Sequence, residues 1–323
     1  MLNPQCFLTL AAAAPQSTGE QLIQHCVIGL TTGSLIALIA LGYTMVYGII
    51  GLINFAHGDL FMLGAFLSLS ILTALGMTGA DVTPLGSFGA LVVCFLTVPL
   101  FCGGLNWAVD RIVYKPLRNA PKLAPLVSAI GVSFIFMNIG LLWIGAADTN
   151  YPKLISERSL WEASSIQFTV KDLMVISITV PIMIVLTLFV KMTRLGKAMR
   201  AVEQNPVAAQ LMGINVDRVI GAAFMIGGGL GGVASVVYSL YINTVSFQMG
   251  FQNGLYAFTA AVLGGIGKLP GAVLGGLIIG LARSFGSAYV GERWTGSLIF
   301  MILIAILVFR PAGLLGRSAQ EKV

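Results

Sequence analysis

Eight long apolar runs constrain the fold of this sequence more than any other feature. Each approaches or exceeds the roughly 20 mostly apolar residues that a helix needs to cross a membrane. Only 9% of the residues are charged, against about 25% in a soluble domain, so the runs cannot be the buried cores of a soluble protein. The sequence therefore predicts an all-α, polytopic membrane protein. The runs are residues 27–50, 59–76, 88–108, 125–145, 173–190, 219–241, 270–290 and 295–309.

A further apolar run near residues 255–266 is shorter and ends in the glycine- and proline-rich sequence GGIGKLPGA. A run of this length is below the usual requirement for a transmembrane helix, and it indicates a re-entrant or broken helix, or part of a ninth span. We therefore expect about eight or nine transmembrane helices, with short re-entrant or broken segments.

The positions of Lys and Arg predict the orientation, because cytoplasmic loops carry an excess of positive charge. Segments 111–122 and 191–218 are basic, and Arg310 and Arg317 follow the last run, whereas the loop 146–172 is balanced in charge. The first 25 residues carry no Lys or Arg. We expect the N-terminus outside and the C-terminus inside, which requires an odd number of spans and favours nine. An N-terminus inside with eight spans is the alternative.

These boundaries divide the chain into a single transmembrane domain with short ends. Residues 1–26 are expected to form a flexible N-terminal tail, with removal of a signal peptide as the alternative. Residues 27–317 form the transmembrane domain, which includes the cytoplasmic loop 191–218. Residues 318–323 form a C-terminal tail.

The segment 197–218, KAMRAVEQNPVAAQLMGINVDR, is the most polar stretch in the C-terminal half of the chain. Asn205 can cap free backbone N–H groups, and Pro206 suits a first helical position, where no N–H is needed. Gly213 can adopt the left-handed conformation that ends a helix. These signals predict a helix of about seven residues, roughly 10 Å long.

A helix this short is marginal in water, so we expect packing to hold it. An apolar stripe for that packing would come from Val207, Ala208, Leu211 and Met212, and Asn215 or Asp217 could cap the next membrane helix. An ordinary cytoplasmic loop with one helical turn is the alternative. The two caps favour a helix that docks on a cytoplasmic partner.

The longer segment RLGKAMRAVEQNPVAAQLMGINVDRVIGAAF resembles the cytoplasmic loop of permeases in the branched-chain amino acid ABC importer family. Ala208, Ala209 and Gly213 are similar in spacing to the core of the "EAA" loop of ABC importer permeases, although Val207 stands where the broader motif has Glu. Two further blocks, residues 37–65 and 257–280, resemble the first membrane region and the late glycine-rich segment of LivH-type permeases.

This resemblance implies a subunit of a bacterial inner-membrane importer for leucine, isoleucine and valine. It implies a second permease subunit, two cytoplasmic ATP-binding subunits and a periplasmic substrate-binding protein as partners. ATP and magnesium would bind the ATPase subunits, and this chain would bind no cofactor. The short helix would be the ATPase-coupling helix. The residues that the resemblance places in ATPase coupling are Arg200, Glu203, Asn205, Pro206, Ala208, Ala209, Leu211 and Gly213.

The sequence LINFAHGDLF contains the most conspicuous polar cluster within the apolar runs, formed by Asn54, His57 and Asp59. Polar groups at membrane depth are costly unless they are paired or face water. Asn54, His57 and Gly58 are candidates for a translocation path, with Gly58 allowing the helix to break. The alternative is a structural role, in which these residues hold a kinked helix by hydrogen bonds.

Two glycine-rich sequences look like nucleotide-binding motifs but fail as such. GGGLGG at 227–232 has no strand before it, and we expect Gly227, Gly228, Gly231 and Gly232 to let helices pack closely instead. GGIGKLPG lacks the first glycine of a phosphate-binding loop, and Leu269 replaces its Ser or Thr. The chain is therefore not expected to be the ATPase.

Other functions find little support in the sequence. A metal site is not expected because no Cys/His cluster is present, and no basic patch with interleaved aromatic residues indicates nucleic acid. No arrangement of catalytic residues favours a membrane enzyme. Arg283 is expected to extend toward the outer interface, with a functional role as the alternative. The alternatives are an importer permease for urea or short amides, and a stand-alone secondary transporter. Membrane lipid would surround the chain in each case.

Overall fold

The computed structural model describes residues 18–52, 54–77, 84–118, 120–121, 123–161, 166–265, 267–310 and 312–316. The first part of the predicted N-terminal tail and the predicted C-terminal tail lie outside the described residues. So do Lys122 and Arg317, which contribute to the predicted orientation.

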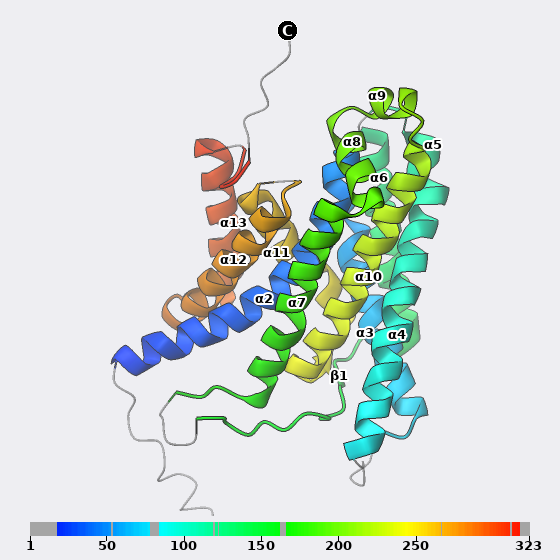
Figure 1. Ribbon diagram of the computed structural model, residues 1–323. Helices are drawn as coiled ribbons and strands as arrows, with labels where there is room; N and C mark the ends of the chain where they lie inside the picture. The colour runs from blue at the N-terminus through cyan, green and yellow to red at the C-terminus, as the bar shows by residue number, and fades with distance from the viewer. Residues whose placement is uncertain are drawn as a thin grey trace, which may run out of the picture.

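The described chain is an all-α membrane protein, as predicted (Figure 1). Eight of its helical spans are long and apolar enough to cross a membrane. They comprise α2 (Thr18–Ile50), α3 (Ala56–Ala74), α4 (Pro84–Val109), α6 (Leu123–Ile144), α7 (Val170–Met192), α10 (Val216–Ile242), α12 (Leu269–Tyr289) and α13 (Glu292–Phe309). The shorter elements are η1 (Asp110–Tyr114), α5 (Lys115–Leu117), β1 (Thr149–Asn150), α8 (Arg194–Gln204), α9 (Pro206–Leu211), β2 (Thr244–Val245) and α11 (Met249–Gly264).

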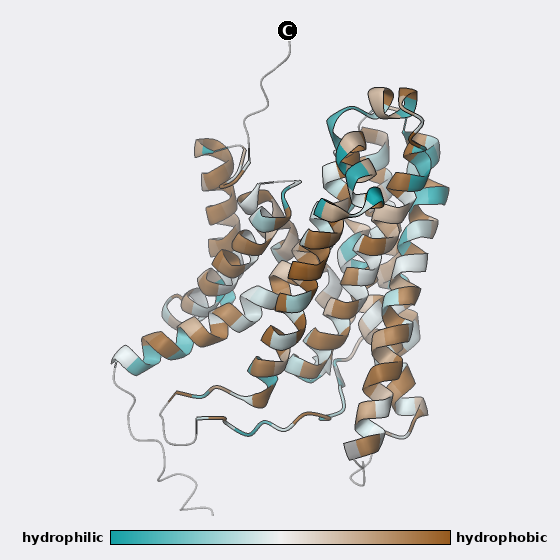
Figure 2. Ribbon diagram, viewed as in Figure 1, coloured by the Kyte–Doolittle hydropathy of each residue, from teal (hydrophilic) through white to brown (hydrophobic). Residues whose placement is uncertain are grey.

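Helices α2, α3 and α10 form the centre of the bundle, and the other spans surround them. In their most apolar stretches α3 is 78% buried and α2 and α10 are each 72% buried, whereas α13 is 11% buried. The exposed surfaces of the outer helices are apolar as well, and Figure 2 shows apolar residues along the shafts of the helices and polar residues around α8 and α5. This distribution fits a bundle surrounded by lipid.

The segments that were predicted to be cytoplasmic lie together at one end of the bundle. Helices α5, α8 and α9 are at this end, and the loop between α6 and α7 is at the other (Figure 1). Helix α2 begins at the end opposite α9, whereas α13 ends on the α9 side (Figure 1). The predicted separation of the two ends of the transmembrane region is confirmed, and it requires an odd number of crossings.

Helix α11 supplies the additional crossing. Its 16 residues span about 24 Å at 1.5 Å per residue, which is less than the hydrocarbon core of about 30 Å. It packs against α2, α3 and α12, so its backbone is enclosed by other helices. The sequence indicated either a broken helix or part of a ninth span, and the structure contains a short continuous helix. At the end of the bundle opposite α9, β1 pairs antiparallel with β2 and joins the loop after α6 to the loop after α10 (Figure 1).

Helix α2 starts earlier than the sequence suggested. The prediction that residues 1–26 form a tail is wrong for residues 18–26, which belong to α2. Long-range contacts order this part: Gln24 Nε2 donates to Gln167 O at 3.1 Å, and Gln167 N donates to Gln24 Oε1 at 2.7 Å. The 33 residues of α2 span about 50 Å, more than the hydrocarbon core, and the helix lies obliquely in the bundle (Figure 1).

The basic segment after α4 is helical, although its charge and its Pro suggested a loop. Helix α4 continues through the π-helical turn η1 into α5. Such turns are frequent at functional sites because they change the direction of the side chains around them. Here the turn carries Asp110 and Tyr114, both of which are buried.

Candidate functional site

Helix α8 is held tightly against the C-terminal end of α7. Thr193 Oγ1 caps α8 by accepting from Gly196 N at 3.0 Å, and Arg200 Nη2 donates to Lys191 O at 3.1 Å. The side chains of Met199 and Val202 are buried beneath the helix. Arg200, which the sequence assigned to ATPase coupling, therefore connects α8 to α7 within this chain.

Helix α9 has the two ends that the sequence predicted. Asn205 Oδ1 accepts from Ala208 N at 3.0 Å, and Pro206 occupies the first helical position. Gly213 has a φ of +81°, and the backbone beyond α9 turns back so that Ile214 N donates to Ala209 O at 3.0 Å. The helix has six residues rather than about seven.

The apolar residues of α9 face outward, which differs from the prediction that they hold the helix in place. Val207 is 67% exposed, Leu211 84% and Met212 82%, and Ala208 is exposed as well. Ala209 alone among the residues of α9 is buried. The caps and the Ala209 contact therefore hold the helix. We define the exposed side chains of Val207, Leu211 and Met212 as the α9 tip.

The α9 tip lies at the end of the molecule, beyond the membrane-spanning part of the helices (Figure 1). Lipid does not cover an apolar cluster in this position, and exposed apolar clusters of this kind often mark protein–protein contacts.

Glu203 is exposed near the end of α8. A Cβ placed on Gly267 would lie 3.4 Å from Glu203 Oε1. Glu203 therefore lies beside the connection between α11 and α12.

Ion pairs connect the segment after α9 to the segment after α4. Asn215 Oδ1 caps α10 by accepting from Arg218 N at 3.0 Å, which leaves Asp217 free for side-chain contacts. Asp217 pairs with Lys115 at 2.7 Å and also contacts Arg118. Arg118 in turn reaches the buried carboxylate of Asp110 at 2.8 Å. These residues join α10 to η1 and α5 directly below α9.

A buried hydrogen-bond network continues from η1 toward the start of α3. Tyr114 Oη donates to Asn54 Oδ1 at 3.2 Å, and Asn54 Nδ2 donates to Asn106 Oδ1 at 3.1 Å. Asn106 Nδ2 donates to Phe224 O on α10 at 2.7 Å. We call Asn54, Asn106 and Tyr114 the asparagine network. It places Asn54, a candidate for the translocation path, at a contact between helices.

His57 and Asp59 point into different parts of the bundle and do not form a pair. The ring of His57 lies 4.6 Å from the ring of Tyr43 and fits against Gly42 and Gly231, where added Cβ atoms would meet the imidazole. The Asp59 carboxylate contacts Ser133 on α6. Neither ring nitrogen of His57 has a hydrogen-bond partner within the described chain. The arrangement offers no His–Asp proton relay.

Gly58 does not break a helix, contrary to the expectation from the sequence. It lies inside α3, and the break between α2 and α3 occurs at Gly51, whose φ is +64°. A Cβ added at Gly58 would lie 2.5 Å from Gly250 O and 2.8 Å from Gly254 Cα. Gly58 therefore allows α3 and α11 to pack with their backbones close together.

Four of the five glycines of the GGGLGG motif lie on faces of α10 that contact three other helices, α2, α3 and α4. An added Cβ at Gly227 would lie 3.0 Å from Gly42 O on α2, and one at Gly228 would lie 2.5 Å from Cys102 O on α4. Gly231 adjoins His57, and a Cβ at Gly232 would lie 2.8 Å from Pro99 Cα. These glycines have the packing environment expected from the sequence.

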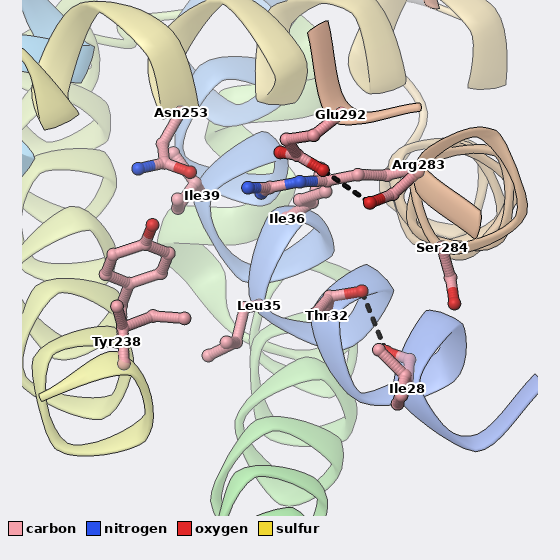
Figure 3. Close-up of a pocket in the computed structure, with 12 residues that line it drawn as sticks. Ile28, Thr32, Leu35, Ile36, Ile39, Tyr238, Asn253, Arg283, Ser284 and Glu292 are labelled. Carbon is pink, nitrogen blue, oxygen red and sulfur yellow. Dashed lines mark hydrogen bonds between the residues drawn. The ribbon is translucent and has the colours of Figure 1, made fainter. Parts of the chain in front are cut away.

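A cavity of about 190 Å³ near the outer end of the bundle was not anticipated from the sequence. It lies between α2, α10, α11, α12 and α13, and Arg283 projects into it (Figure 3). Arg283 Cζ lies 5.3 Å from the centre of the Tyr256 ring. Arg283, which was expected to extend toward the outer interface, lines this cavity near the end of the bundle opposite α9. Ser284, Ser287 and Glu292 follow Arg283 closely in sequence, whereas Thr32, Tyr238 and Asn253 reach the cavity from distant segments, so a local pattern could not reveal the whole lining. In the part of the chain that the structure describes, no group of His, Cys, Asp and Glu side chains could hold a metal ion.

Comparison with known proteins relates this arrangement to a family. The family model described as branched-chain amino acid transport system / permease component matches residues 26–307. The chain is 40% identical over 304 residues to the high-affinity branched-chain amino acid transport system permease protein BraD of Pseudomonas aeruginosa, covering 93% of this chain and 98% of that protein.

Two further relatives show the range of similarity. The chain is 40% identical over 310 residues to the high-affinity branched-chain amino acid transport system permease protein LivH of Escherichia coli, covering 93% of this chain and 97% of that protein. It is 26% identical over 229 residues to the fructose import permease protein FrcC of Rhizobium meliloti, covering 67% and 61% respectively. No solved structure matches the chain.

Proposed function

This chain belongs to the family of branched-chain amino acid transport system permease components, and on that premise we propose that it carries leucine, isoleucine and valine across the bacterial inner membrane as the permease subunit of an ABC importer. The observation that carries the proposal is 40% identity along 93% of the chain to permease proteins of high-affinity branched-chain amino acid transport systems. The similarity includes almost the whole bundle, so it is not confined to one motif.

The proposed importer contains a second permease subunit, two cytoplasmic ATP-binding subunits and a periplasmic substrate-binding protein. ATP and magnesium bind the ATP-binding subunits in this proposal, and this chain contributes a passage through the membrane. The exposed α9 tip supports a cytoplasmic partner, because three large apolar side chains are presented to water at the end of the molecule. We propose that an ATP-binding subunit covers this tip.

The contacts around α9 suggest how its movement would reach the membrane helices. A displacement of α9 would pull on α8, which is tied to α7 through Arg200, and on the start of α10. Asp217 would transmit the displacement to η1 and α5 through Lys115 and Arg118. The asparagine network would then connect η1 with Asn54 at the boundary between α2 and α3. This route links the proposed coupling helix to the centre of the bundle.

Uptake by intact cells tests the proposal. The gene for this chain is deleted in its host, and uptake of labelled leucine, isoleucine, valine and urea is measured at low concentration, with the gene restored on a plasmid as the control. We expect deletion to reduce uptake of the three amino acids, plasmid expression to restore it, and urea uptake to stay unchanged. A deletion that lowers urea uptake and leaves the amino acids unaffected would favour the urea or amide importer instead.

A further inference from the structure

The cavity at the outer end of the bundle has an apolar wall and two opposite charges. Leu35, Ile36 and Ile39 of α2 form much of the wall and are almost completely buried. Arg283 of α12 and Glu292 of α13 bring a cation and a carboxylate to the same cavity (Figure 3). An apolar pocket with a few convergent polar groups is the usual form of a small-molecule site.

The cation is held by an aromatic ring and is available to a ligand. Arg283 extends from α12 into the cavity, with its guanidinium group toward Ile36 and Ile39 (Figure 3). Its Cζ lies 5.3 Å from the centre of the Tyr256 ring, a distance typical of a cation–π contact. Within the described ranges no carboxylate forms an ion pair with Arg283. A planar guanidinium in this state is well suited to a ligand carboxylate.

The cavity also offers hydrogen-bond acceptors, Glu292 beside Arg283 and Asn253 on α11 (Figure 3). Glu292 Oε2 accepts from Ser287 Oγ at 2.5 Å, which orients the carboxylate and leaves its other oxygen for a ligand. Asn253 is buried, and its Nδ2 donates to Met249 O at 2.9 Å. That bond fixes the amide so that its oxygen points into the cavity (Figure 3). Both groups can accept hydrogen bonds from an ammonium group.

We propose that this cavity is a binding site for a zwitterionic aliphatic α-amino acid on the outer side of the transport path. Arg283 binds the α-carboxylate, Glu292 and Asn253 Oδ1 accept from the α-ammonium, and the side chain lies against Leu35, Ile36 and Ile39. This site rests on the proposed function, and it places the binding of the transported amino acid in this cavity. A site with one cation and one carboxylate suits a neutral zwitterion, whereas urea carries no charge and would leave both groups without a partner.

Thermal unfolding of the assembled importer in lipid nanodiscs tests the site directly. Millimolar L-leucine is compared with isocaproate, which lacks the ammonium group, and with isoamylamine, which lacks the carboxylate. A ligand that binds the folded state raises Tm, so leucine is expected to raise the Tm of the wild-type complex and each analogue to raise it much less. The substrate-binding protein is left out of this experiment, so that it cannot account for the effect.

Substitutions separate the site from a general effect of leucine. We expect Arg283→Gln and Glu292→Gln each to remove the leucine-dependent rise in Tm and to lower leucine affinity about tenfold or more. Arg293→Gln is the matched control, because Arg293 is exposed beside Glu292 and does not line the cavity. It is expected to respond to leucine as the wild type does.

Three results would overturn the proposal: no leucine effect on the wild type, an undiminished effect in Arg283→Gln, or equal effects of leucine and both analogues. The last would indicate a purely apolar occupant such as a lipid tail. ATP-driven leucine uptake by the same wild-type complex, with the binding protein added, tests the proposed function separately. A complex that transports leucine but fails the Tm test refutes only the site. A complex that transports no leucine refutes the proposed function.

Discussion

At the scale of single residues, short-range hydrogen bonds define α9 and long-range ones define the interior. Asn205 caps a helix that begins at the next residue. Tyr114 and Asn54, in contrast, are 60 positions apart and meet in the centre of the bundle. Polar groups buried in a membrane protein need such partners, because neither water nor lipid can supply them at that depth.

The cap of α9 can be tested by substitution of Asn205. Replacement of an N-cap residue by Ala typically costs about 1 kcal/mol, and a six-residue helix has few other contacts to offset that loss. We expect Asn205→Ala to reduce ATP-driven leucine uptake several-fold. Asn205→Asp keeps an acceptor oxygen at this position and should retain most of the uptake. Equal uptake by both variants and the wild type would contradict a role for the cap.

The contact between α3 and α11 can be tested at Gly58. A Cβ at this position would lie 2.5 Å from Gly250 O, and overpacking of a well-packed interior typically costs about 1–3 kcal/mol. We expect Gly58→Ala to lower the Tm of the detergent-purified protein. Gly131→Ala is the matched control, because an added Cβ at Gly131 meets no atom within 4 Å. A Gly58→Ala protein as stable as this control would show that the two helices are not in close contact.

The positions and contacts of some side chains could be predicted from the sequence, and those of others could not. The roles of Asn205 and Gly213 in defining α9 depend on neighbours within a few positions, so they could be predicted. The cavity around Arg283 is lined by helices from both ends of the chain, so its presence could not be predicted. His57 and Asp59 are only two positions apart in sequence, but their side chains face different helices.

Among the helices, α2, α3 and α10 form the core of the bundle, and the other spans surround them. The spans could be predicted because a helix in lipid needs about 20 apolar residues, a property of the sequence alone. The first turns of α2 could not be predicted, because Gln24 is held there by hydrogen bonds to Gln167 in a distant loop. Helix α11 was ambiguous because it is short and is enclosed by neighbouring helices.

The α9 tip makes a prediction about binding of the ATP-binding subunit. Leu211 is 84% exposed at the end of the molecule, so a charge there should disturb a partner and not the fold of this chain. We expect Leu211→Glu to insert normally but to lose co-purification of the ATP-binding subunit, while Leu211→Met retains it. Undiminished co-purification and uptake by Leu211→Glu would place the partner on another surface.

The ion pairs below α9 predict a defect in coupling without a defect in stability. Asp217 is about half exposed, and exposed ion pairs contribute about 0–1 kcal/mol, so Asp217→Asn should change Tm little. Because Asp217 is the link to Lys115 and Arg118, we expect ATP hydrolysis to continue while leucine uptake per ATP falls. The exchange Asp217→Lys with Lys115→Asp should recover part of this ratio. An unchanged ratio in Asp217→Asn would show that coupling follows another route.

The whole molecule is a membrane bundle with a proposed docking tip at one end and a proposed amino acid site near the other. The ion pairs and the asparagine network lie between the two. In the part of the chain that the structure describes, the buried His57 and Asp59 do not form the pair that a proton relay would use. We infer from the family of this chain and from the exposed α9 tip that its transport depends on ATP-binding partners.

Leucine uptake into proteoliposomes tests that claim most directly. Vesicles contain either the complete importer, with ATP supplied to the ATP-binding subunits and binding protein on the opposite side, or this chain alone with an imposed proton or sodium gradient. We expect the complete importer to accumulate leucine only when ATP is present, and the chain alone to accumulate none. Accumulation by the chain alone, driven by the ion gradient, would contradict the account.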